Sequence, residues 1–233
     1  MAATTETLKM ARIAGMDYAE AADGMTVAIR GFNMEMQDAA HVTDVYSKVA
    51  AITASDTQEL VTAMSKTASS AASVGSSFEN TTAMLAVMVE ATRESPQNIG
   101  SAMKSIISRY GEMTKGLSED SEGEEIDYNR VDTALKSIGV SIKDASGQFR
   151  DFDEVIFELS EKWNTLDSVT QRYVATIFAG NRQQSRFLAL VSNSERLKEV
   201  SEAAANSEDA GLLQYSKTLD SLETKINNIK TGF

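Results

Sequence analysis

The sequence has 233 residues, of which 42% are hydrophobic and 6% aromatic, so it can bury a core but does not have the composition of a large β-sheet. It contains no cysteine, which excludes a disulfide framework, a thiolate zinc site and a thiol nucleophile. The formal net charge of −12 disfavours sequence-independent binding to nucleic acid and to anionic lipid surfaces.

The first residues already show helical spacing, through Leu8, Ala11 and Ile13. The chain is rich in Ala, Met, Leu, Glu and Lys, which are helix formers, and it has a single proline. No apolar run approaches the roughly 20 residues needed to cross a bilayer, so neither a membrane span nor a signal peptide is expected. We therefore predict an all-α fold, a multi-helix bundle of short capped helices.

Two helices are predicted between residues 55 and 95, each with a capping residue followed by apolar positions three and four residues apart. Ser55-Asp56-Thr57-Gln58 matches a capping box for the first helix, and Ser76 or Ser77 can cap the second. The predicted buried stripes are Leu60, Val61, Met64 and Ala68 in the first helix and Leu85, Met88, Val89 and Thr92 in the second.

The only proline marks the start of the next helix. Ser95 can cap this helix while Pro96 occupies its first position, where no amide donor is needed. Because the turn before it is short, this helix and the preceding one should lie roughly antiparallel, facing each other or a shared third helix. Its predicted stripe is Ile99, Met103, Ile106, Ile107 and Tyr110.

Residues 116–127 are predicted to be an acidic flexible loop, because they are too charged and too poor in apolar side chains to be buried. They do not keep the ligand spacing of a calcium-binding loop. This loop divides the chain into an N-terminal helical subdomain at 1–115 and a second helical subdomain at 128–208, and residues 209–233 are the start of a coiled coil.

The second subdomain is predicted to open with a helix from about Tyr128 to Ile138. A small β-hairpin at about 140–150 follows, because its residues alternate and then turn at Ser146-Gly147. Asp151 with Glu154 then opens a helix. Its stripe is Phe152, Val155, Ile156, Leu159, Trp163 and Leu166, which places the single tryptophan in the core.

A further helical pattern starts at Ser168 and Gln171, which are expected to form its cap. Gly180 is placed to stop this helix in a left-handed conformation, and Asn181 restarts the pattern. The apolar positions are Tyr173, Val174, Ile177 and Phe178 before the glycine and Phe187, Leu188, Leu190 and Val191 after it.

The C-terminal segment carries an unbroken heptad repeat with spacings of three and four residues. Such a narrow stripe favours a partner helix in a coiled coil, although an ordinary terminal helix packed on the domain is the alternative. The repeat is still running at the last residue, which indicates a fragment of a longer chain. We call this stripe the seam and predict that it mediates self-association: Leu212, Tyr215, Leu219, Leu222, Ile226, Ile229 and Phe233.

No catalytic, cofactor-binding or metal-ligating residues are predicted, and no cofactor is expected. His41 is the only histidine, and no Gly-rich phosphate loop of the common types is present. Glu94-Ser95 resembles the end of the catalytic helix in muralytic transglycosylases, where a glutamate is the general acid. The glycine and the downstream Gly-Leu-Met-Gln type segment of those enzymes are missing, so Glu94 is expected to end a helix beside a cap.

Two stretches of the chain, residues 39–114 and 140–191, resemble the core region of phage tail tape measure proteins. With the first helices, the resemblance covers most of the chain. It is carried by Val42-Thr43-Asp44-Val45, Ile99-Gly100-Ser101-Ala102-Met103, Asp144-Ala145-Ser146-Gly147-Gln148-Phe149-Arg150 and Phe178-Ala179-Gly180-Asn181-Arg182.

The resemblance implies a long helical protein that fills the tail tube, sets tail length during assembly and leaves ahead of the DNA at infection. It implies a location in the tail tube lumen of the virion after assembly in the host cytoplasm. The implied partners are the tail tube protein, tail assembly chaperones and, during infection, the host envelope. No direct nucleic-acid binding is predicted, because of the net charge. Two alternatives stay open: a non-phage helical scaffold that recruits partners through the same seam, and a muralytic enzyme using Glu94.

Overall fold

The computed structural model describes residues 2–114 and 128–231, in which the chain forms eleven α-helices and two short 3-10 helices. The predicted all-α fold class is confirmed for these residues. The predicted acidic loop at 116–127 lies outside them. The helices are α1 (Ala2–Ala14), α2 (Tyr18–Gly31), η1 (Met36–Asp38), α3 (Ala39–Ile52), α4 (Thr57–Ser73), α5 (Phe78–Thr92), α6 (Pro96–Thr114), α7 (Tyr128–Ser137), α8 (Phe152–Lys162), η2 (Trp163–Thr165), α9 (Ser168–Val191), α10 (Ser194–Ala205) and α11 (Ala210–Thr231).

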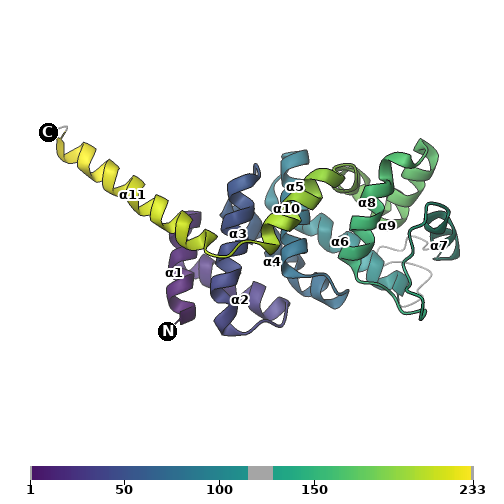
Figure 1. The fold of residues 1–233 in the computed structure, drawn as a ribbon, viewed down its shortest axis with the longest axis horizontal. Helices are drawn as coiled ribbons and strands as arrows, with labels where there is room; N and C mark the ends of the chain where they lie inside the picture. The colour runs from purple at the N-terminus through teal and green to yellow at the C-terminus, as the bar shows by residue number, and fades with distance from the viewer. Residues whose placement is uncertain (1, 115–127, 232–233) are drawn as a thin grey trace.

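The body of the molecule is elongated, with α1 to α3 towards one end, α4 to α6 in the middle and α7 to α9 towards the other end (Figure 1). α10 lies beside α5 and brings the chain back toward the first helices. α11 then packs with its first turns on α1 and α3 and projects away from the body (Figure 1).

The capping residues predicted from the sequence are correct in two places and shifted by one residue in two others. Ser77 caps α5 by accepting a hydrogen bond from the Asn80 amide at 3.1 Å, as predicted. Pro96 is the first residue of α6, also as predicted. The capping box of α4 is instead formed by Asp56 and Glu59, and Asp167, not Ser168, caps α9. Both residues carry a carboxylate, which accepts from helix N-terminal amides and interacts favourably with the helix dipole.

The predicted β-hairpin at 140–150 is wrong, because the described residues there form a turn with one isolated antiparallel bridge between Lys143 and Phe149. The Asp144 carboxylate accepts hydrogen bonds from the amides of Ser146 and Gln148, which satisfies the turn locally. No neighbouring strand is present among the described residues to extend the pairing, and a lone pair of strands is marginal in water.

The centre of the body is a close crossing of α4 and α6, which shows that α4 is the third helix shared by the predicted pair α5 and α6. A side chain at Gly100 would place its Cβ 2.4 Å from the carbonyl oxygen of Ala63. Thr67 donates its hydroxyl to the carbonyl oxygens of both Ala63 and Gly100 at 3.1 Å. Glycine at position 100 therefore permits a backbone approach that any other residue would prevent.

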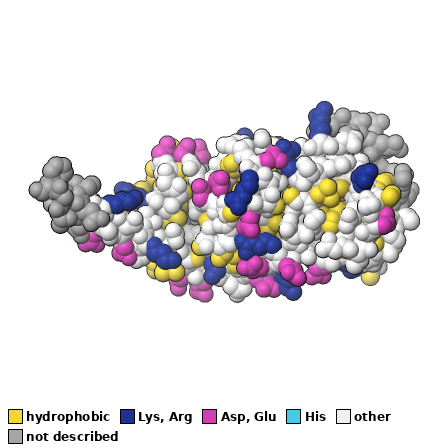
Figure 2. Space-filling view, turned by 90° about the horizontal axis from the view of Figure 1, so that it is seen from above, with side chains coloured by type: hydrophobic (Ala, Val, Ile, Leu, Met, Phe, Trp, Pro, Cys, Tyr) yellow, Lys and Arg dark blue, Asp and Glu magenta, His cyan; other side chains and the backbone are white. Residues whose placement is uncertain are grey.

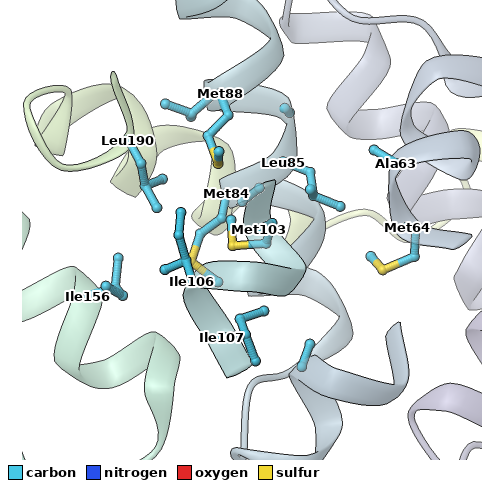
Figure 3. Packing of buried hydrophobic residues seen from close by; sticks show 14 of the residues in the cluster. Ala63, Met64, Met84, Leu85, Met88, Met103, Ile106, Ile107, Ile156 and Leu190 are labelled. Carbon is cyan, nitrogen blue, oxygen red and sulfur yellow. The ribbon is translucent and has the colours of Figure 1, made fainter. Parts of the chain in front are cut away.

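One hydrophobic cluster runs through elements of both predicted subdomains. Met84, Met103 and Ile106 lie together in its middle, with Ile156 and Leu190 close by (Figure 3). Trp163 is buried as predicted, whereas Thr92 and Leu166, also placed in buried stripes, are half-buried. The subdomain division stays a prediction.

Candidate functional site

The seam lies on α11, which is a helix as predicted, and most of its described side chains face solvent. The exposed fractions are 56% for Leu212, 45% for Leu219, 39% for Leu222 and 51% for Ile226. Tyr215 is half-buried, and the side chains of Ile229 and Phe233 lie outside the described part. These exposed leucines and isoleucine are a surface that a partner could cover, and self-association stays a prediction.

α11 has two parts with different surroundings. We call residues 210–218 the root and residues 219–231 the arm. In the root, Gly211 is buried, and Gln214, Tyr215 and Thr218 are half-buried at helical spacing. This side of the root faces α1 and α3, while the arm extends beyond the body (Figure 1).

The first turn of the root is joined to α3 through the side chain of Asp44. Asp44 Oδ1 accepts the amide proton of Gly211 at 2.8 Å. Burial raises the pKa of the Asp44 carboxyl, and hydrogen bonds from the Gly211 and Asp209 amides lower it by less. The Asp44 side chain, from the middle of α3, thus lies beside the N-terminus of α11.

Two cavities flank the root. The larger, about 400 Å³, lies between α3 and the start of α11 and is lined by Lys48, Ile52, Leu213 and Lys217 among others. The smaller, about 180 Å³, reaches from Gln214 to α1. The root therefore packs on α1 and α3 with a hollow on either side of it.

His41 forms an ion pair rather than part of a metal site. Its Nε2 lies 2.5 Å from Glu79 Oε1, which joins α3 to α5. The hydrogen bond to Glu79 raises the pKa of His41 and lowers the pKa of Glu79. Across the described residues, no group of three or more His, Asp or Glu side chains is placed to hold a metal ion.

Glu94 forms a bidentate ion pair with Arg186 of α9. Arg186 Nε lies 3.1 Å from Oε1 and 3.0 Å from Oε2, and Nη2 lies 2.5 Å from Oε2. Glu94, which lies in the turn between α5 and α6, therefore joins this turn to α9.

Two buried charged residues join distant helices and were missed in the sequence. Arg109 of α6, which is 4% exposed, donates from Nε to the Ile177 carbonyl oxygen at 3.0 Å. Asp153 of α8 accepts from the Ser77 amide at 3.1 Å and from the Asn80 side chain at 2.8 Å. Arg109 could have been noticed because it is one residue from Tyr110 and three from Ile106, at the edge of a buried stripe.

Residues 1–179 match the family of phage-related minor tail proteins. The chain belongs to this family. Minor tail proteins are structural parts of a phage tail, so the chain is a phage tail component and the non-phage scaffold alternative is not supported. No membrane-spanning helix is found among the helices described for this minor tail protein.

This minor tail protein is also similar to the tape measure protein of Pneumococcus phage Dp-1. The two are 27% identical over 234 residues, an alignment that covers 100% of this chain. The chain spans 19% of the length of that relative. No solved structure matches the chain.

Proposed function

We propose that this chain is a compact folded module of a tape measure protein and that the extended measuring rod begins near Leu212. In this function the whole protein lies in the tail tube lumen, sets tail length and leaves ahead of the genome at infection. The observation that carries the proposal is the contrast between a body of short packed helices and one helix that projects from it with exposed apolar side chains (Figure 1).

A helix adds length only while it is uninterrupted, at about 1.5 Å per residue. The 22 residues of α11 therefore span about 33 Å. The helices of the body fold back on one another, and α9 bends at Gly180. Residues of the body should therefore not add to the length of a measuring rod.

Tail length measured by electron microscopy tests this proposal. Duplicating residues 212–232 adds three heptads and should lengthen tails by about 32 Å. Inserting the same number of residues at the exposed Ser146-Gly147 turn should leave the mean length unchanged, and in-frame deletions between Ser55 and Val191 should not shorten tails by the helix rise per residue. Shortening in strict proportion to those deletions would overturn the proposal.

We also propose that the chain associates with itself through the seam. The support is the heptad spacing and the exposure of Leu212, Leu219, Leu222 and Ile226. Replacing Leu219 and Ile226 together with glutamate should weaken association in sedimentation experiments, and Leu213→Glu is the matched control because Leu213 is 60% exposed but lies off the seam. A native chain that stays monomeric at every concentration would contradict self-association.

The remaining partners we propose are the tail tube protein, tail assembly chaperones and, during infection, the host envelope, with no direct contact to nucleic acid. The net charge of −12 is consistent with the last point, because it repels phosphate backbones at long range. Co-purification of the chaperones with the full-length protein from infected host cytoplasm would support this set, and their absence would count against it.

A further inference from the structure

We propose that Asp44 is a latch that fixes the direction in which the arm of α11 leaves the body, by accepting the first-turn amide of that helix. Without this acceptor, the arm swings about the connection at residues 206–209. The inference concerns this chain alone and holds whether or not the arm belongs to a measuring rod.

The connection between α10 and α11 has the features of a hinge. α10 ends at Ala205 and α11 begins at Ala210, so no helix spans the joint. Asp209 has a φ of 62°, a left-handed conformation that is uncommon for a residue other than glycine. The hydroxyl of Ser207 is buried without a hydrogen-bond partner, so the joint is not held by a complete set of polar contacts.

The root approaches α3 closely at Gly211. At Gly211, an added Cβ would lie 2.9 Å from both Asp44 Oδ1 and Thr43 Cγ2. The two cavities of about 400 and 180 Å³ lie beside this point. The root also packs on α1 and α3. The hydrogen bond at Asp44 adds a directional contact at the first turn of α11, so it should set the orientation of this helix.

The latch depends on a hydrogen-bond acceptor and not on a negative charge. Asp44 is half-buried, and the carboxylates of Asp209 and Glu6 both disfavour its ionised form. On α3, the titratable neighbour of Asp44 is His41, and the charge of Asp44 helps to raise the pKa of His41. Burial raises the pKa of Asp44, so its surroundings as a whole disfavour the charge. An asparagine, which keeps the acceptor oxygen, should therefore hold the arm as well as aspartate does.

The absence of cysteine from the chain allows this to be measured with two introduced spin labels. We would place them at Lys66 on α4 and Lys225 on the arm, which are both exposed. Pulsed electron paramagnetic resonance should give one narrow distance distribution for the native sequence and for Asp44→Asn. Asp44→Ala should lose the narrow peak and give a broad distribution.

A second variant separates release of the arm from loss of folding. Gly211→Ala should also give a broad distribution, because the new Cβ meets Asp44 and Thr43, while alanine favours the helix itself. Asp220→Asn, which removes a charge from an exposed position of the arm, should behave as the native chain. The proposal is overturned if Asp44→Ala and Gly211→Ala keep the native distribution, or if Asp44→Asn broadens it as much as Asp44→Ala does.

Discussion

At the scale of single residues, buried polar side chains connect helices that are far apart in sequence. Arg109 is the clearest case, because its guanidinium reaches the Ile177 carbonyl just before the bend in α9. Gly180 has non-helical backbone angles, so carbonyls before it lose regular partners within the helix. A cation at such a helix end satisfies an acceptor and interacts favourably with the helix dipole.

We predict that Arg109→Met lowers the free energy of unfolding by about 1–3 kcal/mol, because it leaves a buried carbonyl without its donor. Urea denaturation measures the change. Arg12→Met is the matched control, since Arg12 is exposed in the last turn of α1, and it should change stability by less than about 0.5 kcal/mol. Equal effects of the two substitutions would contradict the role assigned to Arg109.

The pair formed by His41 and Glu79 should make stability depend on pH. The pKa of His41 is raised above 6.5. The stabilisation of the fold by protonated His41 is therefore fully present below that value and is lost as pH rises through the raised pKa. The pKa of Glu79 is lowered below 4.5. The stabilisation of the fold by ionised Glu79 is therefore present above that value and is lost as pH falls through the lowered pKa.

We therefore predict that, as pH rises from about 6 to 9, the native chain loses stability relative to His41→Gln. Thermal unfolding followed by circular dichroism across this range measures the difference. Because the chain has a single histidine, the effect can be assigned to one side chain. Parallel curves for the two proteins would show that the pair contributes nothing to folding.

At the scale of helices and turns, Gly180 marks a bend within α9. The sequence predicted a break there, and the structure has a bend with φ 58° and ψ −179°, after which the helix continues. This backbone region is essentially restricted to glycine, at a cost of about 1–3 kcal/mol for other residues.

Gly180→Ala should accordingly destabilise the fold by about 1–3 kcal/mol in chemical denaturation. Gly111→Ala is the matched control, because Gly111 lies within α6 and an added Cβ would make only an ordinary contact, 3.4 Å from Val74. That control should be neutral or slightly stabilising. A stable Gly180→Ala variant would mean that α9 can straighten without cost.

The helices could be predicted from the sequence because caps and apolar spacing are local. Ser77, Pro96 and the stripe from Ile99 to Tyr110 follow from residues within a few positions of one another. The pairing of α4 with α6 could not be predicted in this way. It depends on Gly100 meeting Ala63, two positions that no local pattern relates.

Dependence on distant contacts also explains why the predicted hairpin is wrong and why the two parts of α11 could not be predicted from the sequence. Alternation between Val140 and Arg150 is compatible with a strand, but pairing also requires partners that the fold does not provide among the described residues. The seam residues could be identified from spacing alone. Their division between a root held by Asp44 and a free arm depends on a contact 167 residues apart.

At the scale of the whole molecule, the body has a continuous hydrophobic core that does not extend into α11. One hydrophobic cluster includes residues from α1 to α10, whereas the apolar residues of α11 from Leu212 to Ile226 are largely exposed. The face shown in Figure 2 mixes acidic and basic side chains around scattered apolar ones. The body can therefore fold around its own core, while α11 offers its apolar side chains outwards.

Imaging of the full-length protein inside an intact tail by electron cryomicroscopy tests this arrangement most directly. We predict a compact helical body for residues 2–114 and 128–205, and an extended helix along the tube axis from about Leu212 onward. Residues 55–191 drawn out as continuous helix in the lumen, or a chain found only outside the tube, would contradict it.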